Sequence, residues 1–195
     1  ITSVMTTAGN PVPAVKIESD GLMTISPVVK PPVVNDYDSF IAAVRASGAV
    51  GLGGAGFPTS VKLDVKDTSR IKEIIINSAE CEPYITSDTR TMIDRADDIA
   101  EGCRLLEKYL NVKKIHIGIE KNKPEAIASM RRLAANDPAV EVRVLPSFYP
   151  QGGEKVIIYS ITGKIVPEGK LPIDVGTIVI NCTTLAFIAS YIKTG

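Results

Sequence analysis

The chain has 195 residues, 45% of them hydrophobic, and its 22 lysines and arginines balance its 22 aspartates and glutamates. This composition excludes intrinsic disorder, and the length allows one full domain with a small additional segment. Because the formal net charge is zero, no overall field attracts nucleic acid or an anionic lipid surface, so we expect neither as a partner.

The first 35 residues are predicted to form a short β-rich segment. They are rich in Pro, Val and Thr, with short alternating runs such as residues 15–18, a pattern that favours small strands over helix. The prolines at 31 and 32 indicate a linker. We therefore expect a second domain over residues 36–195, opened by a helix that is capped near Asp36 or Asp38 and ends at Gly48.

In the second domain, apolar runs typical of strands alternate with helical patterns. This alternation predicts an α/β fold, Rossmann-like, with a mainly parallel sheet. Ligand sites in such folds lie beyond the carboxyl ends of the strands. The expected strands are 74–76, 114–119, 140–145 and 176–180, and the expected helices are 88–110, 124–135, one from 153 and one from 183. An apolar stretch over 177–192 is interrupted by polar residues, so a strand that leads into a helix explains it better than a membrane span.

The three cysteines are an odd number and form no Cys-x-x-Cys pair. This pattern supports neither a disulfide framework nor a metal or iron–sulfur site, so we expect no metal ligands and a reducing, cytoplasmic setting. Cys81 lies between two glutamates that would raise its pKa, which favours a packing role. His116 lies inside a predicted strand, where a packed histidine is favoured over a catalytic one.

Four polar loops carry the candidate chemistry. The first, Gly51 to Thr59 followed by Lys62, has four glycines in six residues. It matches neither standard nucleotide-binding motif, so a structural turn and a phosphate cradle both remain open. The second and third, 77–84 and 149–155, each follow a predicted strand, and the second can equally be a solvated turn. The fourth, 181–184, can cap the last helix and bind a phosphate.

The order and spacing of these loops resemble one protein family. Gly-Leu-Gly-Gly-Ala-Gly-Phe-Pro-Thr with Lys62, Asn-Ser-Ala-Glu-Cys-Glu-Pro, Tyr-Pro-Gln-Gly-Gly-Glu-Lys and Asn-Cys-Thr-Thr resemble the flavin-binding, NADH-oxidising 51 kDa subunit of respiratory complex I and its relatives. Within that family the chain is most similar to the C subunits of Rnf electron-transport complexes. The resemblance covers residues 37–195 and implies the 51 kDa-type FMN-binding α/β domain. Residues 1–35 resemble the end of the barrel-sandwich domain that precedes it.

The resemblance assigns cofactor-binding roles to individual positions, with FMN as cofactor and NADH as substrate. It implies a loop beside the flavin and the dinucleotide formed by Gly51, Gly53, Gly54, Ala55, Gly56 and Phe57. It implies phosphate contacts from Lys62, Asn181, Thr183 and Thr184, and flavin-ring contacts from Asn77 and Gly152. It implies a dinucleotide site lined by Glu80, Glu82 and Glu154, in which Glu82 would repel the 2′-phosphate of NADPH. The complex I motif has Asp where Ala79 stands and a second Glu where Gly153 stands, so the resemblance implies that two polar contacts to flavin or NADH are absent here.

The function implied is that of an FMN-binding electron-transfer module of an Rnf-type ferredoxin:NAD oxidoreductase, an NADH dehydrogenase-type subunit. Hydride would pass between NADH and FMN without a catalytic side chain, because the cofactors carry the chemistry. Electrons would pass to 4Fe–4S clusters in a C-terminal region outside this chain. The implied partners are other subunits of a membrane-bound complex, with ferredoxin contacted indirectly, and the chain would lie on the cytoplasmic face of the membrane without inserting into it. Alternatives are the flavin module of a cobalamin reductase or of a proline-reductase electron-transfer protein, and a degenerate docking scaffold that has lost the flavin.

Overall fold

The computed structural model describes residues 1–22, 24–51 and 56–195. It divides into two units, residues 1–30 and 31–195. The first unit contains an antiparallel hairpin of β1 (Thr2–Met5) and β2 (Pro11–Ala14), whose side chains are almost all exposed. A two-stranded hairpin with no buried face has little to stabilise it alone, so the core of the protein lies in the second unit.

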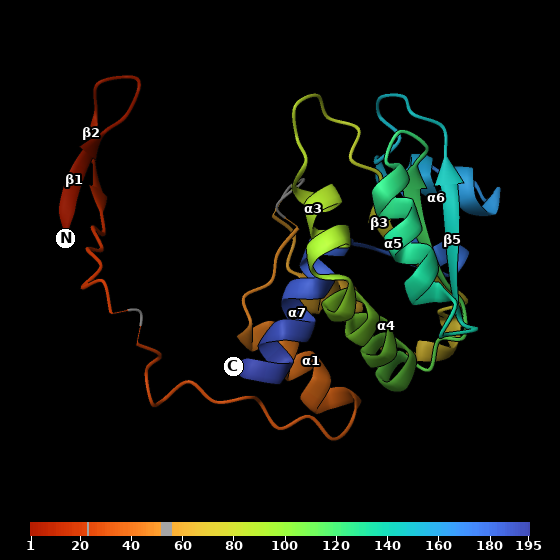
Figure 1. Cartoon of the computed structure of the whole chain (residues 1–195), viewed down its shortest axis with the longest axis horizontal. Coiled ribbons are helices and arrows are strands. Elements are labelled where there is room, and N and C mark those ends of the chain that lie inside the picture. Colours follow the sequence, from red (N-terminus) through yellow and green to blue (C-terminus); the bar gives the residue numbers. More distant parts are fainter. Residues whose placement is uncertain (23, 52–55) are drawn as a thin grey trace. The chain divides into compact units, whose positions relative to one another are not determined.

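The second unit is built on a four-stranded sheet in the order β5-β4-β3-β6. The strands are β3 (Glu73–Ser78), β4 (Ile115–Glu120), β5 (Val140–Leu145) and β6 (Thr177–Asn181). All three neighbouring pairs are parallel, and helices cover both faces, which explains why the central strands are nearly continuous apolar runs. The predicted α/β fold with a parallel sheet is confirmed (Figure 1).

Most of the helices lie where the sequence predicts them. They are α1 (Tyr37–Ala46), α2 (Thr59–Leu63), α3 (Ser87–Asp94), α4 (Ala96–Leu110), α5 (Pro124–Ala134), α6 (Glu154–Thr162) and α7 (Cys182–Thr194), with short 3₁₀ turns at Thr68–Arg70 and Pro172–Val175. Asp36 caps α1 in a capping box with Ser39. None of the helices that the structure describes is long and apolar enough to cross a membrane.

The single helix predicted over 88–110 is wrong, because two helices meet there at Arg95. This residue leaves the helical conformation, with φ −127° and ψ 33°. Its guanidinium donates to Asp98 at 2.9 Å and to the carbonyl of Ala186 at 3.3 Å. The break gives α3 and α4 different directions, so that α3 packs on α5 and α7 while α4 packs mainly on α7.

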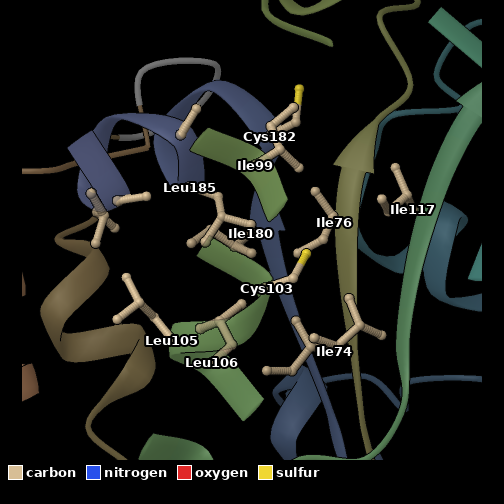
Figure 2. Close-up of a cluster of buried hydrophobic side chains, with 14 of the residues drawn as sticks. Ile74, Ile76, Ile99, Cys103, Leu105, Leu106, Ile117, Ile180, Cys182 and Leu185 are labelled. Carbon is tan, nitrogen blue, oxygen red and sulfur yellow. The ribbon is translucent and has the colours of Figure 1, made fainter. Parts of the chain in front are cut away.

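The larger apolar core lies between one face of the sheet and α1, α4, α5 and α7. Figure 2 shows Ile74 and Ile76 of β3 with Leu106 of α4 and Leu185 of α7 in this cluster. A Cβ at Gly102 would collide with the Leu185 side chain. The close approach of α4 to α7 therefore requires glycine at this position.

A smaller core lies on the other face of the sheet, under α6. It joins Ile75 of β3 and Val179 of β6 to Ile157 and Ile161 of α6. This helix begins directly after the third polar loop, so its packing fixes that loop against the carboxyl edge of the sheet.

Candidate functional site

The parallel sheet brings three of the four polar loops to one edge. Asn77 is the next-to-last residue of β3 and Asn181 is the last residue of β6, and the two are register partners in neighbouring strands. The loop 146–153 follows β5 at the same edge, as expected for the carboxyl ends of parallel strands. Residues more than 100 positions apart in the sequence are thereby held side by side.

The second and third loops are tied together by hydrogen bonds around Gly152. The Asn77 side chain donates to the carbonyl of Gly152 at 2.8 Å and accepts from the backbone N–H of Ala79 at 3.2 Å. The N–H of Gly152 donates to the Cys81 sulfur at 3.4 Å. A Cβ at Gly152 would lie only 2.5 Å from the Ala79 carbonyl oxygen. Glycine is therefore required here by the close approach of the two loops.

The two glutamates of the second loop have different environments. Glu80 is buried, and its carboxylate accepts from the Asp88 N–H at 2.8 Å and the Thr89 hydroxyl at 2.6 Å, with the Lys123 ammonium at 3.5 Å. It therefore holds the first turn of α3. Glu82 is exposed and lines a cavity, so its carboxylate is accessible to a ligand.

This cavity, of about 390 Å³, is lined by Glu80, Glu82, Lys123 and Tyr149 among others. Glu120, at the end of β4, also lines it and is only 2% exposed. Burial raises the pKa of Glu120, and the charges of the two other carboxylates add to the effect while Lys123 opposes it. Three carboxylates beside one lysine suit a ligand that offers hydroxyl or amide donors, and they disfavour a phosphate.

The start of α7 carries a partly buried polar network. Asn181 accepts from the Thr184 N–H at 3.0 Å as the helix cap and donates to Asp88 at 2.7 Å. The Thr183 hydroxyl donates to the other oxygen of Asp88, also at 2.7 Å. Burial raises the pKa of Asp88, although these two hydrogen bonds oppose the shift. The sequence analysis did not single out Asp88, which is simply the first residue of the helix predicted over 88–110.

Lys62 connects the first loop to the third. It lies on α2, a five-residue helix that the sequence analysis did not predict, and its ammonium donates to Glu154 at 2.7 Å and to the carbonyl of Val179 at 3.0 Å. Glu154 is the first residue of α6. Because an ammonium has three N–H donors, one donor remains for a ligand after both bonds are made.

The structure describes only the two ends of the glycine-rich loop. The Gly51 N–H donates to the Phe57 carbonyl at 3.0 Å, and the Gly56 N–H donates to the Gly51 carbonyl at 3.1 Å. Phe57 is 51% exposed, so one face of its ring is available for stacking. The candidate residues Gly53, Gly54 and Ala55 lie outside the described residues.

One further polar side chain at this edge was not recognised in the sequence. Gln151, in the third loop, is 0% exposed, and neither Oε1 nor Nε2 has a hydrogen-bond partner among the residues that the structure describes. Buried carboxamides are rarely left unpaired. The amide beside Gly152 is therefore both unpaired within the described structure and covered by the surrounding protein.

Cys81 and His116, which the sequence analysis left out of the site, lie in surroundings that indicate packing roles. The Cys81 thiol has a raised pKa, chiefly because of burial and also because of the charges of Glu82 and Glu120, so it is not a reactive thiolate at neutral pH. His116 is buried near the amino end of β4, 3.3 Å from Glu73. In the described parts of the chain no three His, Cys, Asp or Glu side chains are grouped to hold a metal ion.

Comparison with known proteins gives consistent matches. The family model of the Nuo51 FMN-binding domain matches residues 44–190. The chain is 44% identical over 191 residues to the C subunit of the Na(+)-translocating ferredoxin:NAD(+) oxidoreductase complex of Acetobacterium woodii, covering 96% of this chain and 43% of that protein. It is 43% identical over 155 residues to the C subunit of the proton-translocating ferredoxin:NAD(+) oxidoreductase complex of Clostridium ljungdahlii, covering 80% and 34%. The chain thus spans less than half the length of these relatives.

Solved structures show the same fold. An NAD+-reducing NiFe hydrogenase in the air-oxidised state superposes with a TM-score of 0.68 at 24% identity, covering 81% of this chain and 30% of the hydrogenase chain. Its H2-reduced state gives a TM-score of 0.64 at 26% identity, covering 81% and 31%.

Proposed function

Because this chain belongs to the family of Nuo51 FMN-binding domains, we propose that it is the FMN-binding electron-transfer module of an Rnf-type ferredoxin:NAD oxidoreductase. The observation that carries the proposal is that the family match over residues 44–190 includes all of the loops joined at the carboxyl edge of the sheet. The chemistry that FMN supplies when bound is hydride exchange with NADH and transfer of single electrons to iron–sulfur clusters, which we expect outside this chain.

The phosphate of FMN is proposed to bind where α7 begins. Free backbone N–H groups in the first turn of a helix bind anions. Thr183 and Thr184 lie in this turn of α7, and Asn181 precedes it as the cap that holds the Thr184 N–H. Lys62 adds the positive charge through its remaining N–H donor. The acidic cavity is lined by three carboxylates and would repel a phosphate more strongly than the start of α7, where, among the described residues, Asp88 is the one carboxylate bonded to Asn181 and Thr183. This difference supports placing the flavin ring toward Gly152 and the phosphate toward α7.

NADH is proposed to enter on the side of the acidic cavity. The exposed carboxylate of Glu82 can accept hydrogen bonds from ribose hydroxyls, and its charge disfavours the 2′-phosphate of NADPH. Phe57 offers an exposed ring for stacking, and Glu154 stands beside Lys62 at the start of α6. Since hydride passes between two bound rings, the side chains act by holding the rings together and excluding water rather than by acid–base chemistry.

The glycine-rich loop, Asn77 and Glu80 are proposed to complete the site. Gly51, Gly53, Gly54, Ala55 and Gly56 would let a ring approach the backbone without interference from side chains. Asn77 and Glu80 also support the site structurally, because Asn77 holds Gly152 and Glu80 holds the first turn of α3.

The proposed partners follow from the relatives, which are named as subunits of ion-translocating ferredoxin:NAD(+) oxidoreductase complexes. We propose that the chain binds other subunits of such a complex at the cytoplasmic face of the membrane, that ferredoxin is contacted indirectly, and that ion translocation belongs to other subunits. The alternative of a flavin-free docking scaffold is favoured by one observation: the amide of Asn77 and the carboxylate of Glu80 are already used by the fold.

An anaerobic absorbance titration separates these functions. FMN is added to the purified chain, unbound flavin is removed, and NADH is then added. Retained flavin that bleaches supports the electron-transfer module, and retained flavin that does not bleach limits the function to FMN binding. If neither this chain nor a longer chain that includes the C-terminal region of the relatives retains flavin, the scaffold is correct. Lys62→Met should retain less flavin. Lys155→Met is its matched control, because the Lys155 ammonium bonds to the carbonyl of Pro167 and not to Glu154.

A further inference from the structure

Gln151 is the only glutamine in the chain, and it is a side chain at this edge whose polar atoms are unused. It is 0% exposed, and its amide nitrogen and oxygen both lack a partner among the residues described. An unpaired buried polar group weakens folding by about 5- to 150-fold in the equilibrium constant. A side chain that destabilises the fold in this way calls for a role outside folding.

The backbone around Gln151 is fully engaged, so the orphaned amide does not reflect a poorly formed turn. The Gln151 N–H donates to the carbonyl of Phe148 at 2.9 Å, and the Gly153 N–H donates to that of Pro150 at 2.9 Å. Gly152 between them is held on both sides by the second loop. The loop is therefore fixed, and the unsatisfied groups are confined to one side chain.

Three carboxamides stand at or near the ends of β3, β5 and β6, and two of them are already hydrogen-bonded through both the nitrogen and the oxygen of the amide. Asn77 uses its nitrogen on Gly152 and its oxygen on Ala79. Asn181 uses its nitrogen on Asp88 and its oxygen on Thr184. Of the three, Gln151 alone has no hydrogen-bond partner for either amide atom among the described residues.

The polar edge of an isoalloxazine ring places carbonyl acceptors next to an N–H donor. A carboxamide carries a donor and an acceptor side by side, so one glutamine can pair with two adjacent atoms of that edge. We propose that Gln151 is a flavin-binding residue, which donates to a ring carbonyl and accepts from the ring N–H of bound FMN. This inference rests on the proposed function, and it requires the side chain to turn from its covered position while the tied backbone stays in place.

The test compares Gln151→Met with the unsubstituted chain in two measurements, stability and FMN affinity, and the substitution should raise the first and lower the second. Methionine has a similar size and no hydrogen-bonding groups, so the flavin-free variant should be more resistant to urea, by about fivefold or more in the folding constant. Its dissociation constant for FMN should rise about tenfold or more, because both hydrogen bonds to the ring are lost. If Gln151 only supported the fold, the substitution would lower both the resistance to urea and the affinity for FMN.

Two further variants keep the result interpretable. Ser78→Ala is the matched control, because it also removes a buried hydroxyl without a partner in the described structure, on the residue after Asn77 and hence on the opposite face of β3. It should leave the FMN dissociation constant unchanged. Gln151→Glu places a carboxylate beside the ring and should make the midpoint potential of bound flavin more negative, because reduction adds negative charge.

The outcomes separate this inference from the proposed function. If the unsubstituted chain binds no FMN, the proposed function fails, and this inference fails with it. If that chain binds FMN and Gln151→Met binds it equally well, with an unchanged potential in Gln151→Glu, only the role of Gln151 is overturned. A flavin-free Gln151→Met that is less stable than the unsubstituted chain would also overturn it, because an internal water would then be the partner.

Discussion

The ion pair of Lys62 and Glu154 allows the phosphate end of the proposed site to be tested, because removing one charge or the other should change the affinity for the FMN phosphate in opposite directions. Two unit charges about 4 Å apart attract by about 4 kcal/mol at an effective dielectric constant of about 20. The Lys62 side chain is 33% exposed and Glu154 already neutralises part of its charge at 2.7 Å, so the net attraction for a phosphate should be reduced to about 1 to 1.5 kcal/mol. Lys62→Met should therefore weaken phosphate binding about tenfold.

The assay is the ratio of the dissociation constants of riboflavin and FMN, measured by flavin fluorescence. Riboflavin lacks the phosphate, so the ratio isolates the phosphate contribution from the ring contacts. Lys62→Met should lower this preference for FMN about tenfold, whereas Glu154→Gln should raise it, because the charge that competes for the ammonium is removed. Lys155→Met should leave it unchanged. An unchanged ratio in Lys62→Met would refute the reasoning, since Lys62 would then serve only to position Glu154.

Three predictions concern stability. Gly152→Ala should cost about 1 to 3 kcal/mol, because its Cβ would meet a carbonyl oxygen at 2.5 Å, whereas Gly51→Ala, with 3.8 Å to its nearest atom, should be close to neutral; thermal unfolding of both variants checks this. Burial raises the pKa of Glu107 from 4.5 to about 7, so the free energy of unfolding should fall by about 1 to 2 kcal/mol as the pH rises from about 4.5 to about 7. Urea titrations of Glu107→Gln at these two pH values should show no such fall. Lys164→Met should cost about 2 to 3 kcal/mol near neutral pH, because Glu73 is buried 2.6 Å from that ammonium. Burial alone would raise the pKa of Glu73, but the Lys164 ammonium and His116 outweigh burial and lower it. The stability that the Glu73 carboxylate contributes is therefore present above pH 4.5 and lost below it. If urea titrations over a pH series show the same loss in Lys164→Met, the assignment is contradicted.

The strands were predictable because the sheet is covered on both faces. Each central strand must then be apolar on both sides, and runs such as Ile74–Ile76 carry that signal without reference to the rest of the fold. Helix ends were predictable where a local hydrogen bond sets them, as at Asp36. The break at Arg95 was not, because it depends on a carbonyl in α7, more than 90 residues further along the chain.

In the site, the sequence identifies the loops but not how their side chains divide the work. Glu80 and Glu82 are two residues apart and look equivalent, yet only Glu80 meets the free N–H groups at the start of α3. Asp88 could be recognised only once α3 and α7 were packed together. The lack of hydrogen-bond partners for the Gln151 amide likewise becomes visible only in the folded chain, because it depends on which described residues surround that side chain.

The two departures from the complex I motif have a physical explanation in this fold. Ala79 is 6% exposed and belongs to the apolar cluster under α6, so a carboxylate there would be placed in an apolar environment next to Cys81 and the Gly152 loop. Gly153 precedes the first turn of α6, and a Cβ added to it would lie 3.1 Å from the Pro150 carbonyl oxygen. Because both positions are uncharged, the acidic side chains at this edge are those of Glu80, Glu82, Asp88, Glu120 and Glu154.

A flavin bound at this edge would meet fewer fixed carboxylates than in the complex I motif. A weaker negative field stabilises the reduced flavin, because reduction adds negative charge to the ring. We therefore expect Ala79→Asp to lower the midpoint potential of bound flavin, measured by anaerobic redox titration of the flavin absorbance. An unchanged or raised potential would show that this position does not face the ring.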